Sequence, residues 1–175
     1  RYEPVARNLL AGNGFSRSVS PPYVADDFEV PGYPSFLAAI YWVFGESDSA
    51  VALTQLAVEG LALFFFWRLA KEVGLPPTTA NLGALLWWLS PWLPSMALAV
   101  ATETLAVMLT GLSCFLLARG GRSGSSVHWA LAGFATGIGI LVRPDAYVFG
   151  AVLPVAALAW APNAGLNLTR KARLA

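Results

Sequence analysis

The sequence predicts an all-α, polytopic membrane protein of about five transmembrane helices, with two further helices on the outer face of the membrane. Composition supports this fold class: 57% of the 175 residues are hydrophobic and only 12% are charged, whereas a soluble domain carries about 25% charged residues. The order of charges supports it as well. Basic clusters recur at every second end of five apolar runs, as in a chain that crosses a bilayer repeatedly and keeps its positive loops in the cytoplasm.

The five apolar runs are the expected spans of a transmembrane bundle at residues 50–162. They lie near residues 50–69, 79–95, 103–118, 127–142 and 146–161. A helix of about 20 residues is roughly 30 Å long, which matches the hydrocarbon core of a bilayer. The third and fourth runs are shorter than this, so their boundaries are approximate.

The basic clusters predict the topology. They follow the first, third and fifth runs and consist of Arg68 and Lys71, Arg119 and Arg122, and Arg170, Lys171 and Arg173. We therefore expect a multi-pass protein of a bacterial plasma membrane, with its N-terminus outside and residues 163–175 as a basic cytoplasmic segment. The junction at 95–103 and the turn at 143–145 then share the outer face with residues 1–49.

Residues 1–49 are the expected outer-face loop with two interfacial helices. Apolar residues at 2, 6, 9 and 10 follow a helical spacing, and the glycines at 12 and 14 predict the end of that helix. The second apolar run, at 35–44, is preceded by Pro31-Gly32-Tyr33-Pro34 and followed by Gly45. It is too short to cross a bilayer, so we expect it to lie on the surface.

Composition also limits the classes of function. A net charge of +1 and the lack of a basic groove argue against a nucleic-acid partner. The single cysteine, Cys114, lies inside an apolar run, so the sequence holds neither a disulfide framework nor a cysteine metal site. No pattern identifies a cofactor, and a need for a divalent metal stays open. Because the chain starts at Arg1 without Met and ends just after a span, we expect it to be a fragment of a longer protein.

Four charged residues on the expected outer face are candidate site residues, each with a structural alternative. Arg143 ends the fourth run, where an arginine either anchors the helix at the interface or binds an anion at the depth of a lipid phosphate. Glu103 opens the third run, where an acid favours the helix macrodipole or serves a site. Asp26 and Asp27 suit a solvated loop, a cation site or a base.

Several motifs occur in one order along residues 1 to about 160. They are Tyr2 followed by ARNLLAGNGF at 6–15, PGYPSFLA at 31–38, Ser90-Pro91, TETL at 102–105, and the run from Ala132-Gly133 through Gly137 to LVRP at 141–144. Their order and spacing resemble the GT-C membrane glycosyltransferases. The resemblance is to the dolichyl-phosphate-mannose protein mannosyltransferase-like and Rgt-type bacterial enzymes in particular.

This resemblance implies that a sugar moves from a polyprenyl-phosphate donor to a lipid, glycan or protein acceptor on the outer face, among membrane lipids. It implies that Arg143 lies near the donor phosphate and that Glu103 is the acid that opens a family span. We expect a catalytic role for Glu103 and assign Arg143, Tyr33, Asp26 and Asp27 to substrate binding. The family's general-base aspartate is expected upstream of Arg1, so we expect this fragment not to catalyse alone.

The rival interpretation is a fragment of a polytopic membrane transporter. Transporters bind their substrates near the bilayer midplane, at broken helices or between internal repeats. Here the sequence has one ionisable residue in the middle of a span, Glu59, and no repeat. The polar residues gather at one face instead, which favours the transferase.

Overall fold

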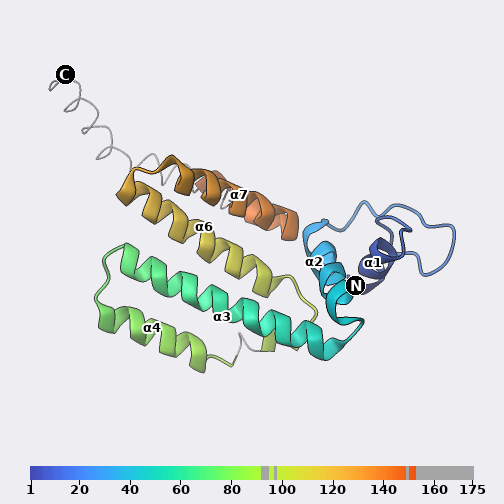
Figure 1. Cartoon of the computed structure of the whole chain (residues 1–175), viewed down its shortest axis with the longest axis horizontal. Helices are drawn as coiled ribbons and strands as arrows, with labels where there is room; N and C mark the ends of the chain where they lie inside the picture. The colour runs from blue at the N-terminus through green and yellow to red at the C-terminus, as the bar shows by residue number, and fades with distance from the viewer. Residues whose placement is uncertain (92–94, 97, 149, 153–175) are drawn as a thin grey trace, which may run out of the picture.

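The computed structural model describes residues 1–91, 95–96, 98–148 and 150–152, and the regular elements in these ranges are all helices. The predicted all-α class is therefore confirmed for the described part of the chain. Four helices form a layered bundle in the order α4, α3, α6 and α7, and α1 and α2 lie across one end of it (Figure 1). The helices are α1 (Glu3–Leu10), α2 (Gly32–Phe44), α3 (Asp48–Glu72), α4 (Pro77–Leu89), α6 (Glu103–Ser123) and α7 (Ser126–Val142), followed by a 3₁₀ turn, η1 (Pro144–Ala146).

Two helices of the bundle are long and apolar enough to cross a membrane. They are α3, with 25 residues, and α6, with 21. The helix α7 has 17 residues and α4 has 13, which correspond to about 25 and 20 Å and fall short of a full bilayer core. The structure thus supports two of the five predicted spans. The run at 146–161 lies mostly outside the described residues, and the total of about five stays a prediction.

Two helix ends differ from the predicted boundaries. The second run was expected to continue to residue 95, but α4 ends at Leu89, and Ser90 is extended because a residue that precedes a proline avoids the helical region. The third run was expected to end at 118, but α6 continues to Ser123. Gly124, whose φ is +65°, caps its end. Gly120 is therefore a packing residue rather than part of the turn: a Cβ there would lie 3.1 Å from Trp129 Nε1.

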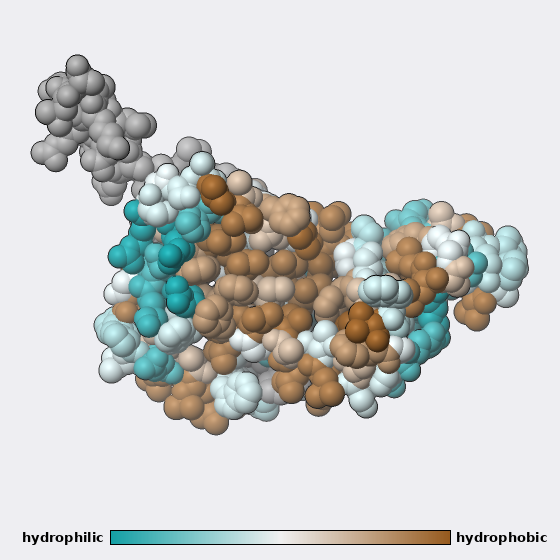
Figure 2. Space-filling model, in the orientation of Figure 1, coloured by the Kyte–Doolittle hydropathy of each residue, from teal (hydrophilic) through white to brown (hydrophobic). Residues whose placement is uncertain are grey.

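The surface divides into an apolar middle and two polar ends. Figure 2 shows the hydrophobic band over the helices of the bundle, with hydrophilic residues beyond it on both sides. At one end, which we call the basic end, Arg119 and Arg122 gather around Glu72, and Arg122 Nη1 donates to the Glu72 carbonyl oxygen at 2.8 Å. The ends of α3 and α6, which carry the basic residues of the first and third runs, therefore lie at the same end of the bundle.

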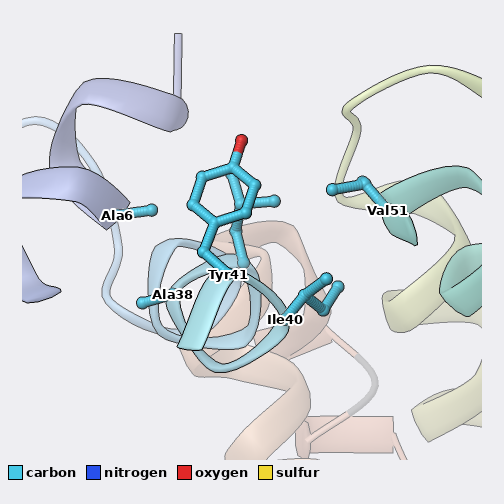
Figure 3. Packing of buried hydrophobic residues seen from close by; sticks show 6 residues of the cluster. Ala6, Ala38, Ile40, Tyr41 and Val51 are labelled. Atoms are coloured by element: carbon cyan, nitrogen blue, oxygen red, sulfur yellow. The ribbon is translucent and has the colours of Figure 1, made fainter. Parts of the chain in front are cut away.

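The two short helices form where the sequence predicts them, at the end opposite the basic end. The helix α1 is followed by Gly12 and Gly14, both at positive φ. The helix α2 begins at Gly32 rather than at 35, because Pro34 falls in the first turn, where a missing N–H costs no hydrogen bond. Their contact surface is apolar: Ala6 of α1 faces Ala38 and Tyr41 of α2, and Ile40 of α2 faces Val51 of α3 (Figure 3).

Candidate active site

The start of α6 and the end of α7 meet at the end of the bundle opposite the basic end. These two helices are antiparallel neighbours, so Glu103, the first residue of α6, lies beside Arg143, which directly follows α7. Arg143 Nη1 donates to Glu103 Oε1 at 2.6 Å. Arg143 Nε and Nη2 donate to the two carboxylate oxygens of Asp145, both at 3.0 Å. The guanidinium therefore has a carboxylate on each of two edges.

The local sequence explains the second of these contacts. Arg143 precedes Pro144, and its backbone is extended, with φ −142° and ψ 121°. Pro144 then starts the 3₁₀ turn, which brings Asp145 back toward the arginine side chain. The Arg-Pro-Asp sequence thus forms a bidentate ion pair within three residues.

The ion pairs fix the charges of the cluster. The hydrogen bonds from Arg143 hold the pKa of Asp145 below its usual range. The hydrogen bonds that Arg143 donates to Asp145 and to Glu103 raise the pKa of Arg143, against the lowering effect of its partial burial. The arginine and the aspartate are both charged at neutral pH. One third of the Arg143 side chain and two thirds of the Asp145 side chain are exposed, so an incoming anion has access to the guanidinium.

Two cavities meet at this cluster. A cavity of about 400 Å³ lies between the loop after α1 and the ends of α6 and α7; its lining residues are Arg1, Tyr2, Phe28, Glu29, Val30, Thr102, Glu103, Val142, Arg143, Pro144 and Asp145. We call it the polar chamber. A second cavity, of about 220 Å³, has mainly apolar walls and is lined by Phe66, Glu103, Ala106, Val107, Thr110, Arg143, Asp145 and Ala146. We call it the apolar groove.

The apolar groove extends from the cluster toward the middle of the bundle. Its lining follows α6 from Glu103 to Thr110, a rise of about 10 Å along the helix axis. Phe66 of α3 closes its deeper part. Glu103, Arg143 and Asp145 line both cavities, so they form the boundary between a polar space and an apolar one.

The structure brings together two of the five predicted site residues, Glu103 and Arg143. Tyr33 is completely buried and lines neither cavity; its ring makes an edge-on contact with Tyr2, at 4.9 Å between centroids. Asp26 pairs with Arg17 within the loop after α1, with a distance of 2.7 Å from Arg17 Nε to Asp26 Oδ2. Asp27 is exposed, and neither aspartate lines the two cavities.

Sequence reasoning missed two acids of this site. Asp145 could have been found from its spacing, since Pro144 favours a turn directly after Arg143 and the acid follows in that turn. Glu29 lines the polar chamber and is buried, paired with Arg1 and 4.0 Å from Arg17 Nη1. Its place depends on the course of a long loop, for which the sequence carries no signal. Within the described ranges, no group of three or more histidine, cysteine, aspartate or glutamate side chains is placed to hold a metal ion.

The polar residue in the middle of a span has a structural partner. Glu59 is buried in α3, and it accepts a hydrogen bond from Trp87 Nε1 of α4 at 2.8 Å. Neither residue of this contact lines the two cavities. The hydrogen bond ties α3 to α4, as expected for an ionisable group inside a helix bundle.

The family of dolichyl-phosphate-mannose-protein mannosyltransferases has a model that matches residues 29–175. The chain belongs to this family. The matched range begins just before α2 and includes Glu103, Arg143, Asp145 and the apolar groove. No curated protein matches the chain, and no solved structure does.

Family membership confirms the resemblance found in the sequence and favours the transferase over the transporter. Dolichyl-phosphate-mannose-protein mannosyltransferases are glycosyltransferases of the membrane, and the long apolar helices α3 and α6 agree with this.

Proposed function

We propose that this protein transfers a sugar from a polyprenyl-phosphate donor to a hydroxyl group of a lipid, glycan or protein acceptor on the outer face of a bacterial plasma membrane. One observation carries the proposal: Arg143 lies where the polar chamber and the apolar groove meet. A polyprenyl-phosphate sugar has the same division. Its chain is apolar, its sugar is polar, and a phosphate joins the two.

The donor fits the site in one orientation. The first part of the polyprenyl chain lies in the apolar groove along α6, and the sugar lies in the polar chamber. The phosphate then lies at Arg143, whose planar fork of N–H donors matches two phosphate oxygens. Asp145 occupies the Nε and Nη2 edge of that fork, so the phosphate replaces the aspartate there. Glu103 continues to accept the hydrogen bond from Nη1.

The reaction exchanges one bond at the sugar's anomeric carbon. The acceptor oxygen bonds to this carbon, and the bond from the carbon to the phosphate oxygen breaks. The acceptor hydroxyl gives its proton to a carboxylate, which the resemblance places upstream of Arg1. Negative charge develops on the leaving phosphate, and Arg143 stabilises it where it forms. Glu103 orients the guanidinium for this contact.

The test is a pair of substitutions at Arg143 in the intact protein. Arg143→Lys keeps a positive charge but loses the fork, and Arg143→Ala loses both. We expect kcat/KM for the lipid-linked donor to fall about 10²–10³-fold in Arg143→Ala, as for the loss of a transition-state donor, and to fall substantially in Arg143→Lys. Arg7→Lys is the matched control, because Arg7 makes a similar exposed ion pair with Glu46, 2.8 Å from Nε to Oε2, outside both cavities. Normal transfer by both Arg143 variants would refute the proposal.

A further inference from the structure

The first residue of α2 touches the backbone beside Arg143. A Cβ atom at Gly32 would lie 2.5 Å from the carbonyl oxygen of Leu141, 2.6 Å from its carbonyl carbon and 2.8 Å from the amide nitrogen of Val142. All three are main-chain atoms, so no side-chain rotation makes room for a methyl group. The last turn of α7, directly before Arg143, therefore rests against the backbone of Gly32.

The next residue, Tyr33, belongs to a buried apolar cluster that borders both charged residues. The same cluster includes Val142, which precedes Arg143, and Leu105, two residues after Glu103. Its hydroxyl donates to Gln55 Oε1 of α3 at 2.7 Å. Gln55 Nε2 in turn donates to the carbonyl oxygen of Ala99 at 2.6 Å, in the segment that leads into α6.

We infer that Gly32 and Tyr33 are positioning residues for sugar transfer, which set the placement of Arg143 relative to Glu103. Gly32 fixes the position of the last turn of α7 relative to α2 by backbone contact. Tyr33 fills the space between the end of α7 and the start of α6, and it holds the segment before α6 through Gln55. This inference rests on the proposed function, since it assigns the two residues to the same reaction. It also gives Tyr33 a role that its complete burial permits.

The decisive variant is Gly32→Ala in the intact protein. The Cβ would have to move by about 1 Å to reach ordinary contact, and a misplacement of about 1 Å costs on the order of 10²-fold in rate. We expect kcat/KM for transfer to fall by about this factor while the melting curve stays cooperative. Gly60→Ala is the matched control, because Gly60 is also a helical glycine and no described atom lies within 4 Å of its Cβ position. It should transfer normally.

A double-substitution cycle separates positioning from a general loss of structure. If Gly32 acts through Arg143, Gly32→Ala should cost less than about twofold in an Arg143→Ala background, since residues that act as a unit are not additive. A structural defect would instead multiply the two losses. Equal losses in both backgrounds would overturn the inference.

A second readout does not depend on transfer. A fluorinated label on Tyr147→Cys, an exposed position just after η1, reports the surroundings of the turn by its ¹⁹F resonance in protein otherwise free of cysteine. Gly32→Ala should shift this resonance, and Gly60→Ala should not. An unshifted resonance in folded Gly32→Ala protein overturns the inference. A shifted resonance with undiminished transfer supports the positioning and refutes the proposed role of Arg143, so the two failures are distinguishable.

Tyr33→Phe tests the other half of the inference with a small change. It keeps the ring in the apolar cluster that includes Val142. It removes the hydroxyl, which donates to Gln55 and has a backbone hydrogen bond with Ala101 directly before α6. With the same label at Leu98→Cys, which is exposed in the segment before α6, we expect a shifted resonance and a lower kcat with an intact melting transition. An unchanged resonance together with an unchanged kcat would limit the positioning role to Gly32 and overturn it for Tyr33.

Discussion

The proposed binding of the donor phosphate predicts that Asp145 competes with it for the Arg143 fork, and Asp145→Asn tests this competition. In the free protein, the aspartate accepts hydrogen bonds from Nε and Nη2 at 3.0 Å. Both side chains are partly exposed, at 33% for Arg143 and 67% for Asp145, and an exposed ion pair is worth about 0.2–1 kcal/mol. Breaking the pair is part of the cost of donor binding. Asn at this position lowers that cost because it lacks the charge and retains only one carbonyl oxygen.

The expected magnitude follows from this energy. If the full 0.2–1 kcal/mol opposes binding, Asp145→Asn lowers the donor Kd by about 1.4- to 5-fold. The same change removes the ion pair from the free protein and costs it a similar, small amount of stability. The assay is a donor titration with a parallel measurement of kcat. Glu46→Gln, which breaks the exposed pair with Arg7 outside both cavities, is the matched control and should leave Kd unchanged.

The pH dependence of the Asp145 effect has a definite sign. Arg143 lowers the pKa of Asp145 in the folded protein, so the pair stabilises the fold above the ordinary carboxyl pKa of about 3.9 and is lost as the pH falls through the lowered value. The advantage of Asp145→Asn should therefore stay constant from about pH 6 to 8. Weaker donor binding in Asp145→Asn, or a large fall in kcat, would refute the competition and assign Asp145 a direct part in the reaction.

Two further predictions concern Glu103 and the topology. Glu103→Gln should lower the rate of transfer about tenfold with little change in melting temperature. The reason is that it weakens a charge-assisted hydrogen bond to Arg143 worth roughly 1.5 kcal/mol. Normal transfer with a small loss of stability, of about 0.3–1 kcal/mol, would mean that this acid only favours the start of α6. Reporter fusions at Gly121 and Ala175 should give a cytoplasmic signal and a fusion at Gly45 should not, because basic loops stay in the cytoplasm. An outside signal at Gly121 would contradict both the predicted orientation and the proposed outer site.

The position of Glu103 and Arg143 at the same end of the bundle was accessible from the sequence because it depends on chain direction. Any antiparallel pair of successive helices brings the start of the first beside the end of the second. The observed 2.6 Å contact depends in addition on how α2 packs against the end of α7, which the order of the helices does not give. The partner at Asp145 was missed because it depends on the backbone angles after Arg143 rather than on the order of the helices.

The burial of Tyr33 could have been predicted from the periodicity of the sequence, although the order of the motifs does not indicate it. Tyr33, Leu37 and Tyr41 recur every four residues and all lie on the buried face of α2, which is the pattern of a packing surface. A motif marks a position as part of a family pattern, but it does not give the direction of a side chain. Glu29 differs from Tyr33 in this respect. Its place beside the polar chamber depends on ion pairs with Arg1, which precedes α1, and with Arg17 of the same loop. The sequence of that loop has no periodicity that predicts them.

The location of the cluster agrees with the physical chemistry of the lipid-linked donor that we propose. A polyprenyl chain gains little by moving from lipid into an apolar groove, since both surroundings are apolar. A phosphate, by contrast, loses much if it leaves water without a partner. Recognition of the donor must therefore come mainly from the phosphate, and the phosphate must stay at the polar end of the helices. Arg143 meets both requirements because it follows the last residue of α7 and borders the groove. The close approach of Gly32 to that helix end then matters because the donor's main polar anchor depends on the position of a single guanidinium.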